Sequence, residues 1–350
     1  MAYTNIDDPS AHFQTATYTG NLVNGHSITN DGNSDLQPDL TWIKARNSST
    51  YNHIWVDSSR GNNLVINSNN TNAEANIGVS VVTPSTDGFS LADWSHINYT
   101  GVTYAAWQWK ANGGTTSSNT SGTITSTVQA NTDAGFSIVT FTSPLSGSFS
   151  VGHGLGVKPD MVITKRLNDT SGWWTWHKGL TNDTTYYLDL SSTSAEASAS
   201  NMWGTAGFTS SVFGMNYPTS AYANSTYVAY CFAEKQGYSK FGKYVGNGNA
   251  NGTFVYTGFK PAFLIVKRID AGDNWVIIDS KRDTYNVQGE ILYANLANAE
   301  GTFASVDSLS NGFKLRQFGP AMNTSGGTYI YMAFAENPFV TSTGIPTTAR

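Results

Sequence analysis

The sequence predicts an all-β protein made of three tandem antiparallel β-sandwich repeats, jelly-roll-like and each about 100 residues long. Three observations predict this fold. Apolar residues alternate with a period of two over short runs, which is typical of strands. Gly, Asn, Ser, Asp and Pro, which favour turns, separate the runs. The same landmarks also recur in the same order in each third of the chain, as tandem repeats require.

The landmarks are a proline-led apolar run that ends in lysine, a Gly-Phe pair, and an apolar stretch rich in Tyr and Ala. The proline-led runs span residues 38–44, 159–165 and 261–267. The Gly-Phe pairs are residues 88–89, 207–208 and 312–313, and the stretches are residues 104–111, 227–234 and 329–336. Each stretch begins 66, 68 or 68 residues after its proline. We therefore expect each stretch to form the central strand of one repeat.

These spacings place repeat 1 at residues 1–112, repeat 2 at 134–237 and repeat 3 at 238–340, followed by a C-terminal tail at 341–350. The segment 113–133 is rich in Gly, Ser and Thr, and this composition predicts a flexible linker. We expect repeats 2 and 3 to move together and repeat 1 to swivel.

The central stretches can be assigned face by face, because neighbouring side chains of a strand point to opposite sides of the sheet. Val228, Tyr230 and Phe232, with their counterparts in the other repeats, form a bulky face that we expect to be the core of each repeat. The opposite face is small in repeats 2 and 3. Gln108 and Lys110 occupy it in repeat 1 and predict a wetter surface there.

Lysines and glutamates at strand ends predict two structural ion pairs. A lysine at the end of an apolar face keeps its ammonium group at the edge of the core. We expect Lys165 to pair with Glu234 and Lys267 to pair with Glu336. Repeat 1 has no acidic residue at the matching position, so Lys44 needs a different partner.

Composition and motifs predict neither an enzyme nor a nucleic-acid-binding protein. Charged residues make up 12% of the chain, the net charge is −5, and no basic stripe is present to bind phosphates. None of the six histidines has a metal-ligand spacing, and the single cysteine, Cys231, is expected in a core. We therefore expect no catalytic residue, no metal and no cofactor. The sequence also contains no apolar run of about 18 residues for membrane insertion and no signal-peptide pattern at Met1.

Tryptophans are the candidate ligand-contacting residues. An exposed tryptophan can stack on a sugar ring, and residues 173–176 contain three of them. The candidate glycan-contacting aromatics are Trp94, Trp173, Trp176 and Trp203. Core packing is the competing interpretation, and the alternation of the cluster favours it.

Several stretches together resemble a known family. They are residues 37–44, 151–156, 227–242, 254–261, 326–329, 334–339 and 344–350. They are similar to three-repeat virion proteins of tailed bacteriophages, common among phages of marine and freshwater bacteria and described as tail-fibre-like or structural proteins with a domain of unknown function. The resemblance implies a virion structural protein, exposed on the particle surface and made in the host cytoplasm without a signal peptide.

From this resemblance we expect a tail fibre or tail-associated protein that contributes to recognition of the host surface. The alternatives are a head decoration or vertex scaffold protein, a carbohydrate-binding module without catalysis, and a polysaccharide depolymerase. The expected partners are the chain itself in a homo-oligomer, with a trimer favoured, other virion proteins, and a glycan or protein of the host surface. We expect the N-terminal repeat to dock on the particle and distal loops to bind the host.

Overall fold

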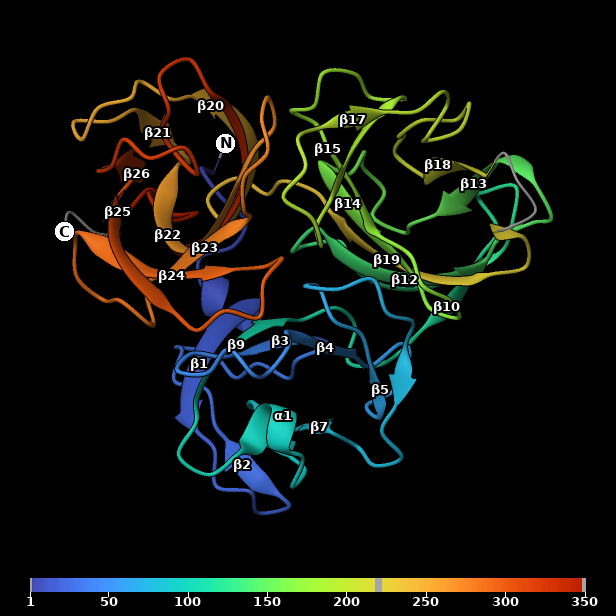
Figure 1. Cartoon of the computed structure of the whole chain (residues 1–350), viewed down its shortest axis with the longest axis horizontal. Coiled ribbons are helices and arrows are strands. Elements are labelled where there is room, and N and C mark those ends of the chain that lie inside the picture. Colours follow the sequence, from blue (N-terminus) through green and yellow to red (C-terminus); the bar gives the residue numbers. More distant parts are fainter. Residues whose placement is uncertain (1, 218–221, 348–350) are drawn as a thin grey trace.

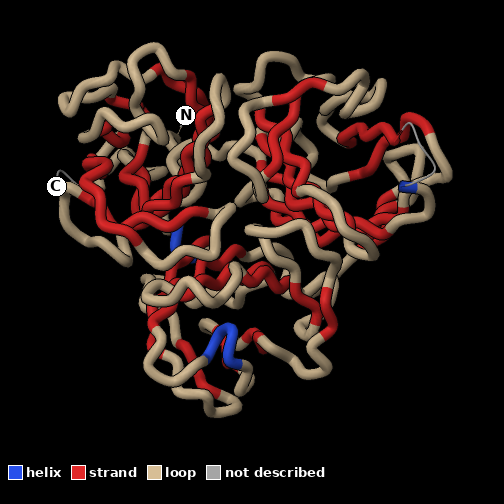
Figure 2. Tube along the Cα trace, in the orientation of Figure 1, coloured by secondary structure: helices blue, strands red, loops and turns tan. Residues whose placement is uncertain are grey.

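The computed structural model describes residues 2–217 and 222–347. Within these residues the chain is all-β with antiparallel pairing of its named strands, and its helices include η1 (Pro9–Ala11) and α1 (Ser95–Asn98) (Figure 2). No helix of the described part is long and apolar enough to cross a membrane. Figure 1 shows three lobes around a common centre. We call the part from η1 to β9 lobe 1, the part from β10 to β19 lobe 2, and the part from β20 to β27 lobe 3.

The strands of each lobe follow one another along the chain with short connections. Lobe 1 contains β1 (Phe13–Thr19), β2 (His26–Ile28), β3 (Leu40–Ala45), β4 (Ile54–Asp57), β5 (Leu64–Val65), β6 (Ala75–Asn76), β7 (Val82–Pro84), β8 (Phe89–Leu91) and β9 (Thr103–Trp109). Lobe 2 contains β10 (Ser117–Asn119), β11 (Ser126–Asn131), β12 (Phe136–Thr142), β13 (Gly147–Gly152), β14 (Met161–Arg166), β15 (Trp173–His177), β16 (Tyr186–Asp189), β17 (Ala197–Ser198), β18 (Val212–Tyr217) and β19 (Thr226–Phe232). Lobe 3 contains β20 (Ser239–Val245), β21 (Phe254–Tyr256), β22 (Phe259–Arg268), β23 (Val276–Asp279), β24 (Gln288–Tyr293), β25 (Gly301–Leu309), β26 (Gly312–Leu315) and β27 (Thr328–Pro338).

The same four-strand order occurs in all three lobes. It is β1-β9-β3-β4 in lobe 1, β12-β19-β14-β15 in lobe 2 and β20-β27-β22-β23 in lobe 3. The registers also correspond: Trp42 faces Trp107, Ile163 faces Tyr230, and Ile265 faces Met332. The stretches predicted to be central strands are β9, β19 and β27, and this prediction is confirmed. They are central because both of their edges are paired.

A smaller sheet or a continuation of the main sheet covers the outer face of each four-strand set. In lobe 1, the sheet β2-β8-β7 packs Ile28, Val82 and Phe89 against Ile43 and Tyr104. In lobe 2 the pair β13-β18 lies over the sheet, and in lobe 3 the main sheet continues through β24, β25, β26 and β21 and nearly closes into a barrel (Figure 1). The sandwich character predicted for the chain is therefore present.

The segment predicted to be a flexible linker is instead part of the fold. Residues 113–133 contain β10 and β11, and β11 pairs along its whole length with β12. The buried carboxylate of Asp39 accepts the backbone N–H groups of Ala111, Gly113 and Gly114 at 2.7, 2.9 and 2.8 Å, which fastens the start of the segment to lobe 1. The linker prediction was wrong because composition does not reveal a strand partner or a distant carboxylate that satisfies the backbone.

The centre of the molecule is an aromatic core shared by all three lobes. Trp109, Phe232 and Phe334 occupy equivalent positions on β9, β19 and β27. Each ring contacts the other two, with centroid distances of 6.3, 5.7 and 6.1 Å. The bulky face predicted to be the core of each repeat is therefore buried between the lobes.

The opposite face of each central strand packs inside its own lobe and is buried as well. Tyr104 and Ala106 lie in the outer core of lobe 1, and Tyr329 and Ala333 lie in that of lobe 3. The wetter face predicted for repeat 1 is wrong at Gln108, which is fully buried and donates to the side chain of Asn30 at 2.6 Å. A buried amide with a matching amide partner can be accommodated because both groups are hydrogen-bonded.

Candidate functional site

Equivalent polar contacts join the lobes in cyclic order. The hydroxyl of Tyr230 in lobe 2 donates to Asp57 Oδ2 of lobe 1 at 2.7 Å. The indole N–H of Trp107 in lobe 1 donates to Asp279 Oδ2 of lobe 3 at 3.0 Å. Tyr230 and Trp107 hold equivalent positions in their lobes, and so do the two aspartates. One interface geometry is therefore used twice by different side chains.

His177 completes the cycle between lobes 2 and 3. It holds the position of the two aspartates, facing Met161 on β14. Its Nε2 lies 3.1 Å from the carbonyl oxygen of Tyr331, and its Nδ1 accepts the backbone N–H of Gly179 at 2.9 Å. This network requires the neutral tautomer with the proton on Nε2. Burial lowers the pKa of His177 to about 3, so the ring stays neutral.

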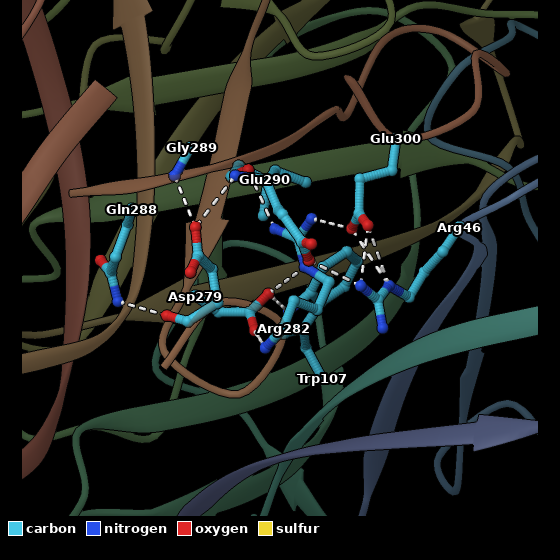
Figure 3. Close-up of polar contacts among 10 residues, drawn as sticks. Arg46, Trp107, Asp279, Arg282, Gln288, Gly289, Glu290 and Glu300 are labelled. Atoms are coloured by element: carbon cyan, nitrogen blue, oxygen red, sulfur yellow. Dashed lines mark hydrogen bonds and ion pairs between the residues drawn. The ribbon is translucent and has the colours of Figure 1, made fainter. Parts of the chain in front are cut away.

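An ion-pair network links lobe 1 to lobe 3 beside these contacts (Figure 3). Arg282 donates to Asp279 at 2.5 Å and to Glu300 at 2.6 Å, and Arg46 of lobe 1 reaches Glu300 at 2.8 Å and Glu290 at 2.6 Å. The side chains of Arg282 and Asp279 are fully buried. Buried charges are tolerated only when paired, so Arg282 and Asp279 stabilise each other within lobe 3, and Arg46 is the residue through which lobe 1 joins the network.

The lysines that end the proline-led strands bind backbone carbonyl groups. Lys165 donates to Thr71 O of lobe 1 at 3.0 Å, and Lys267 donates to Thr193 O of lobe 2 at 3.2 Å. Lys44 donates to carbonyl groups of its own lobe. Burial lowers the pKa of each of these lysines to about 8. Two of the three lysines thus also connect neighbouring lobes.

The predicted pairs Lys165–Glu234 and Lys267–Glu336 are wrong. The strands run antiparallel, so Lys165 faces Val228 while Glu234 lies beyond the opposite end of the ladder. At about 3.4 Å per strand residue, this separates the two charges by roughly 20 Å. Glu234 pairs instead with Lys178 and Lys240.

Glu336 likewise has a different partner, because the same antiparallel register applies in lobe 3. Lys267 faces Ile330 on β27, and Glu336 lies six residues further along the chain. Glu336 forms its ion pair with Lys260, the residue before the proline, at 2.9 Å.

Three of the four tryptophans predicted to contact a glycan are buried. Trp173, Trp176 and Trp203 are fully buried. Trp173 donates to carbonyl oxygens of Asn67 and Asn70 in lobe 1, so it is an interface residue. The prediction is wrong at these three positions, because both faces of β15 are covered at Trp173 and Trp176, and Trp203 is buried in a turn where it donates to Tyr186 O at 2.8 Å.

Trp94 is half-buried and its ring is stacked on another side chain. His96 lies against it with a centroid distance of 4.4 Å and an interplanar angle of 18°. One face of this indole is therefore occupied.

An open groove of about 660 Å³ lies where lobes 1 and 3 meet. Lobe 1 contributes the start of β1 and the turn at residues 31–33. Lobe 3 contributes residues of the hairpin between β23 and β24, together with parts of β22, β25 and β27. The groove has the size of typical small-molecule sites. It is the candidate site that the structure adds to the sequence prediction.

The hairpin that borders this groove is anchored beside the ion-pair network. Asp283, next to Arg282, accepts the backbone N–H of Gly289 at 2.7 Å, and its carbonyl oxygen accepts the side-chain amide of Gln288 at 2.9 Å. Gln288 and Gly289 point toward the same cluster in Figure 3. The wall of the groove is therefore held by the side chain and the carbonyl group of Asp283, the residue after the buried Arg282.

Sequence reasoning missed the groove residues, above all Tyr285 on the hairpin. Tyr285 stands in a polar turn outside any alternating pattern, and 82% of its surface is exposed. One feature of the sequence could have indicated this turn. The connection between the two strands that flank it differs in length among the three thirds of the sequence.

Comparison with known proteins gives a family but no function. Residues 8–338 match the model of a domain of unknown function (DUF7483). The chain belongs to this family. No curated protein and no solved structure matches it.

Among the described residues, no group of three or more His, Cys, Asp or Glu side chains is arranged to hold a metal ion. The candidate site therefore consists of the groove and the polar and aromatic side chains that line it.

Proposed function

We propose that the chain is a structural protein of a tailed-bacteriophage virion, a tail fibre or tail-associated protein that is exposed on the particle and contributes to host-surface recognition. Within this proposal the three lobes are tandem copies of one repeat. The observation that carries the proposal is the closure of three equivalent sheets around the ring triad Trp109, Phe232 and Phe334. The three lobes of a single chain are then arranged with approximate threefold symmetry. A protein of this shape is suited to binding at a symmetric position of a larger assembly.

The surface composition supports an exposed location. Only 12% of the residues are charged, and the remaining polar surface consists largely of uncharged Asn, Ser, Thr and Gly. Such a surface interacts weakly with bulk ions and offers many hydrogen-bonding groups to a neutral ligand. The resemblance of residues 37–44, 151–156 and 227–242 to virion proteins supports the same assignment.

Two assemblies fit the proposal. A homotrimer agrees with the general preference of soluble proteins for closed symmetric oligomers. Alternatively, one chain with its three lobes occupies a threefold position by itself. Light scattering of the purified protein distinguishes the two, because the chain mass is 37.7 kDa and a trimer has three times that mass.

Electron microscopy of intact particles tests the proposal. Antibodies against the purified chain, visualised with gold particles, are expected to label tails. Labelling confined to heads would support a decoration or vertex protein and overturn the tail assignment. If mass spectrometry does not detect the chain in purified particles, the virion role is overturned altogether.

A further inference from the structure

The groove between lobes 1 and 3 is bordered by a hairpin that breaks the similarity among the lobes. Equivalent paired residues on either side of the hairpin are 55 and 66 in lobe 1, 175 and 188 in lobe 2, and 277 and 292 in lobe 3, which are 11, 13 and 15 positions apart. The connection is therefore longest in lobe 3, and its turn carries Tyr285. Extra loop length on a shared framework is where binding residues are commonly added.

Tyr285 is presented by a turn that is held in place. The neighbouring Asn286 donates its amide to Ser308 O at 2.9 Å and accepts the backbone N–H of Ser308 at 2.9 Å. This pair of bonds fastens the turn to β25. A single exposed aromatic ring is common at protein surfaces. Here, however, the ring lines a groove and its backbone is already ordered, which reduces the entropy that a ligand must overcome.

The groove also contains hydrogen-bonding groups that have no partner. The hydroxyl of Thr15 is buried without a hydrogen bond. Among the described residues, the side chains of Asn33, Thr284 and Asn337 also make no hydrogen bond, and all of them line the groove. The Thr15 hydroxyl is enclosed, whereas the side chains of Asn33, Thr284 and Asn337 reach the surface, where an outside partner such as water or a ligand can bind them. Amides and hydroxyls together can both donate and accept.

The charges of the groove are balanced. Lys281 of lobe 3 pairs with Asp31 of lobe 1, and Lys260 pairs with Glu336. These two ion pairs leave no excess charge of either sign to attract an ion, whereas an anionic or cationic ligand would call for one. An uncharged ligand that is rich in hydroxyl groups fits best.

We propose that this groove binds an uncharged oligosaccharide, with the ring of Tyr285 stacked on one sugar. Asn33, Thr284 and Asn337 supply hydrogen bonds to its hydroxyl groups. The proposal rests on the proposed function in one respect, since it takes the host-surface partner to be a neutral glycan. The binding itself is a property of the isolated chain.

Calorimetric titration of the full chain tests the proposal. The probes are maltotetraose, cellotetraose and tetra-N-acetylchitotetraose, a printed array of neutral bacterial glycans, and a hyaluronate tetrasaccharide as the charged comparison. We expect at least one neutral glycan to bind and the hyaluronate fragment not to bind. Absence of binding to every neutral glycan, or a preference for the charged one, overturns the proposal.

Tyr285→Ala and Phe318→Ala are the matched variants. Phe318 is also an exposed aromatic side chain of lobe 3, with 69% of its surface exposed, but it does not line the groove. Loss of a stacking ring is expected to weaken binding on the order of tenfold or more, while the Phe318 variant binds as the parent does. Equal thermal midpoints of both variants and the parent exclude a folding defect. If the Tyr285→Ala variant binds the glycan as tightly as the parent does, the proposal is overturned.

The failure of this proposal and the failure of the proposed function give different results. A chain located on tails that binds no neutral glycan retains the function and loses the groove assignment. A chain that binds a glycan through Tyr285 but is absent from particles retains the groove assignment and loses the function.

Discussion

Arg282 is the buried cation of lobe 3 that neutralises Asp279, the carboxylate to which Trp107 of lobe 1 donates. Its guanidinium donates to Asp279 at 2.5 Å and to Glu300 at 2.6 Å, and the side chains of Arg282 and Asp279 are fully buried. The substitution Arg282→Met keeps an apolar stem of similar length but removes the charge. The Asp279 carboxylate then stays buried, with the indole of Trp107 as its remaining side-chain partner.

The expected loss of stability is large, because removing one member of a buried pair leaves an uncompensated charge. Such changes cost about 3–5 kcal/mol. An unfolding entropy near 2.1 cal/mol/K per residue scales to about 0.7 kcal/mol/K for this chain, so the thermal midpoint should fall by roughly 4–7 °C. Scanning calorimetry measures this shift. The shift should persist in 1 M salt, since buried charges are screened little.

Lys281→Met is the matched control, because it breaks the neighbouring ion pair with Asp31. The side chains of that pair are 35% and 68% exposed. Exposed pairs contribute about 0–1 kcal/mol, so the control should unfold close to the parent temperature. A midpoint for Arg282→Met within about 1 °C of the control would refute the argument that the buried pair stabilises the chain far more than the exposed pair does. The double variant with Asp279→Asn should lose less than the sum of the single losses, because the unpaired carboxylate is gone.

Three further changes probe other parts of the structure. Tyr230→Phe removes the hydroxyl that donates to the buried Asp57 and should cost about 1.5–3 kcal/mol in urea unfolding, so an unchanged midpoint would contradict the contact. Burial lowers the pKa of His177 to about 3. Between pH 3 and pH 6.5 this imidazole is therefore protonated in the unfolded chain and neutral in the folded chain. The contribution of this ring to stability accordingly rises with pH from about 3 to 6.5. The thermal midpoints of the parent and His177→Gln should therefore approach each other on going from pH 7 to pH 4, whereas a constant difference would count against a neutral buried ring. Gly88→Ala places a Cβ 2.1 Å from the carbonyl oxygen of Ile28 at a φ of +90°, so a loss of about 1–3 kcal/mol is expected, and a fully stable variant would exclude strain there.

The strands could be predicted from the sequence because their signal is local. Period-two alternation and flanking turn residues located β9, β19 and β27, and the proline spacing predicted that they would be equivalent. Residues 113–133 were misjudged because a Gly- and Ser-rich segment can still pair when a partner strand is adjacent. Nothing in the segment itself reveals the Asp39 carboxylate that holds its start.

The candidate site could be predicted only in part. Tryptophans were reasonable ligand contacts by residue type, but Trp173, Trp176 and Trp203 are buried in the structure. Tyr285 lies in a turn, where no periodicity marks a residue as exposed and functional. The residues that complete the groove, such as Thr15 and Asn337, lie more than 300 positions apart in the chain and meet only because lobes 1 and 3 pack together.

The sequence by itself determined the all-β class, the three central strands and the division of each strand into a bulky and a small face. Each of these follows from side-chain order along a few neighbouring residues. Only the tertiary structure decided what each face covers. Trp109, Phe232 and Phe334 pack against one another across three lobes, and the antiparallel register carries Glu234 away from Lys165. The residue pattern indicates that both faces of these strands are buried. Which residues cover each face depends on how the three lobes pack together.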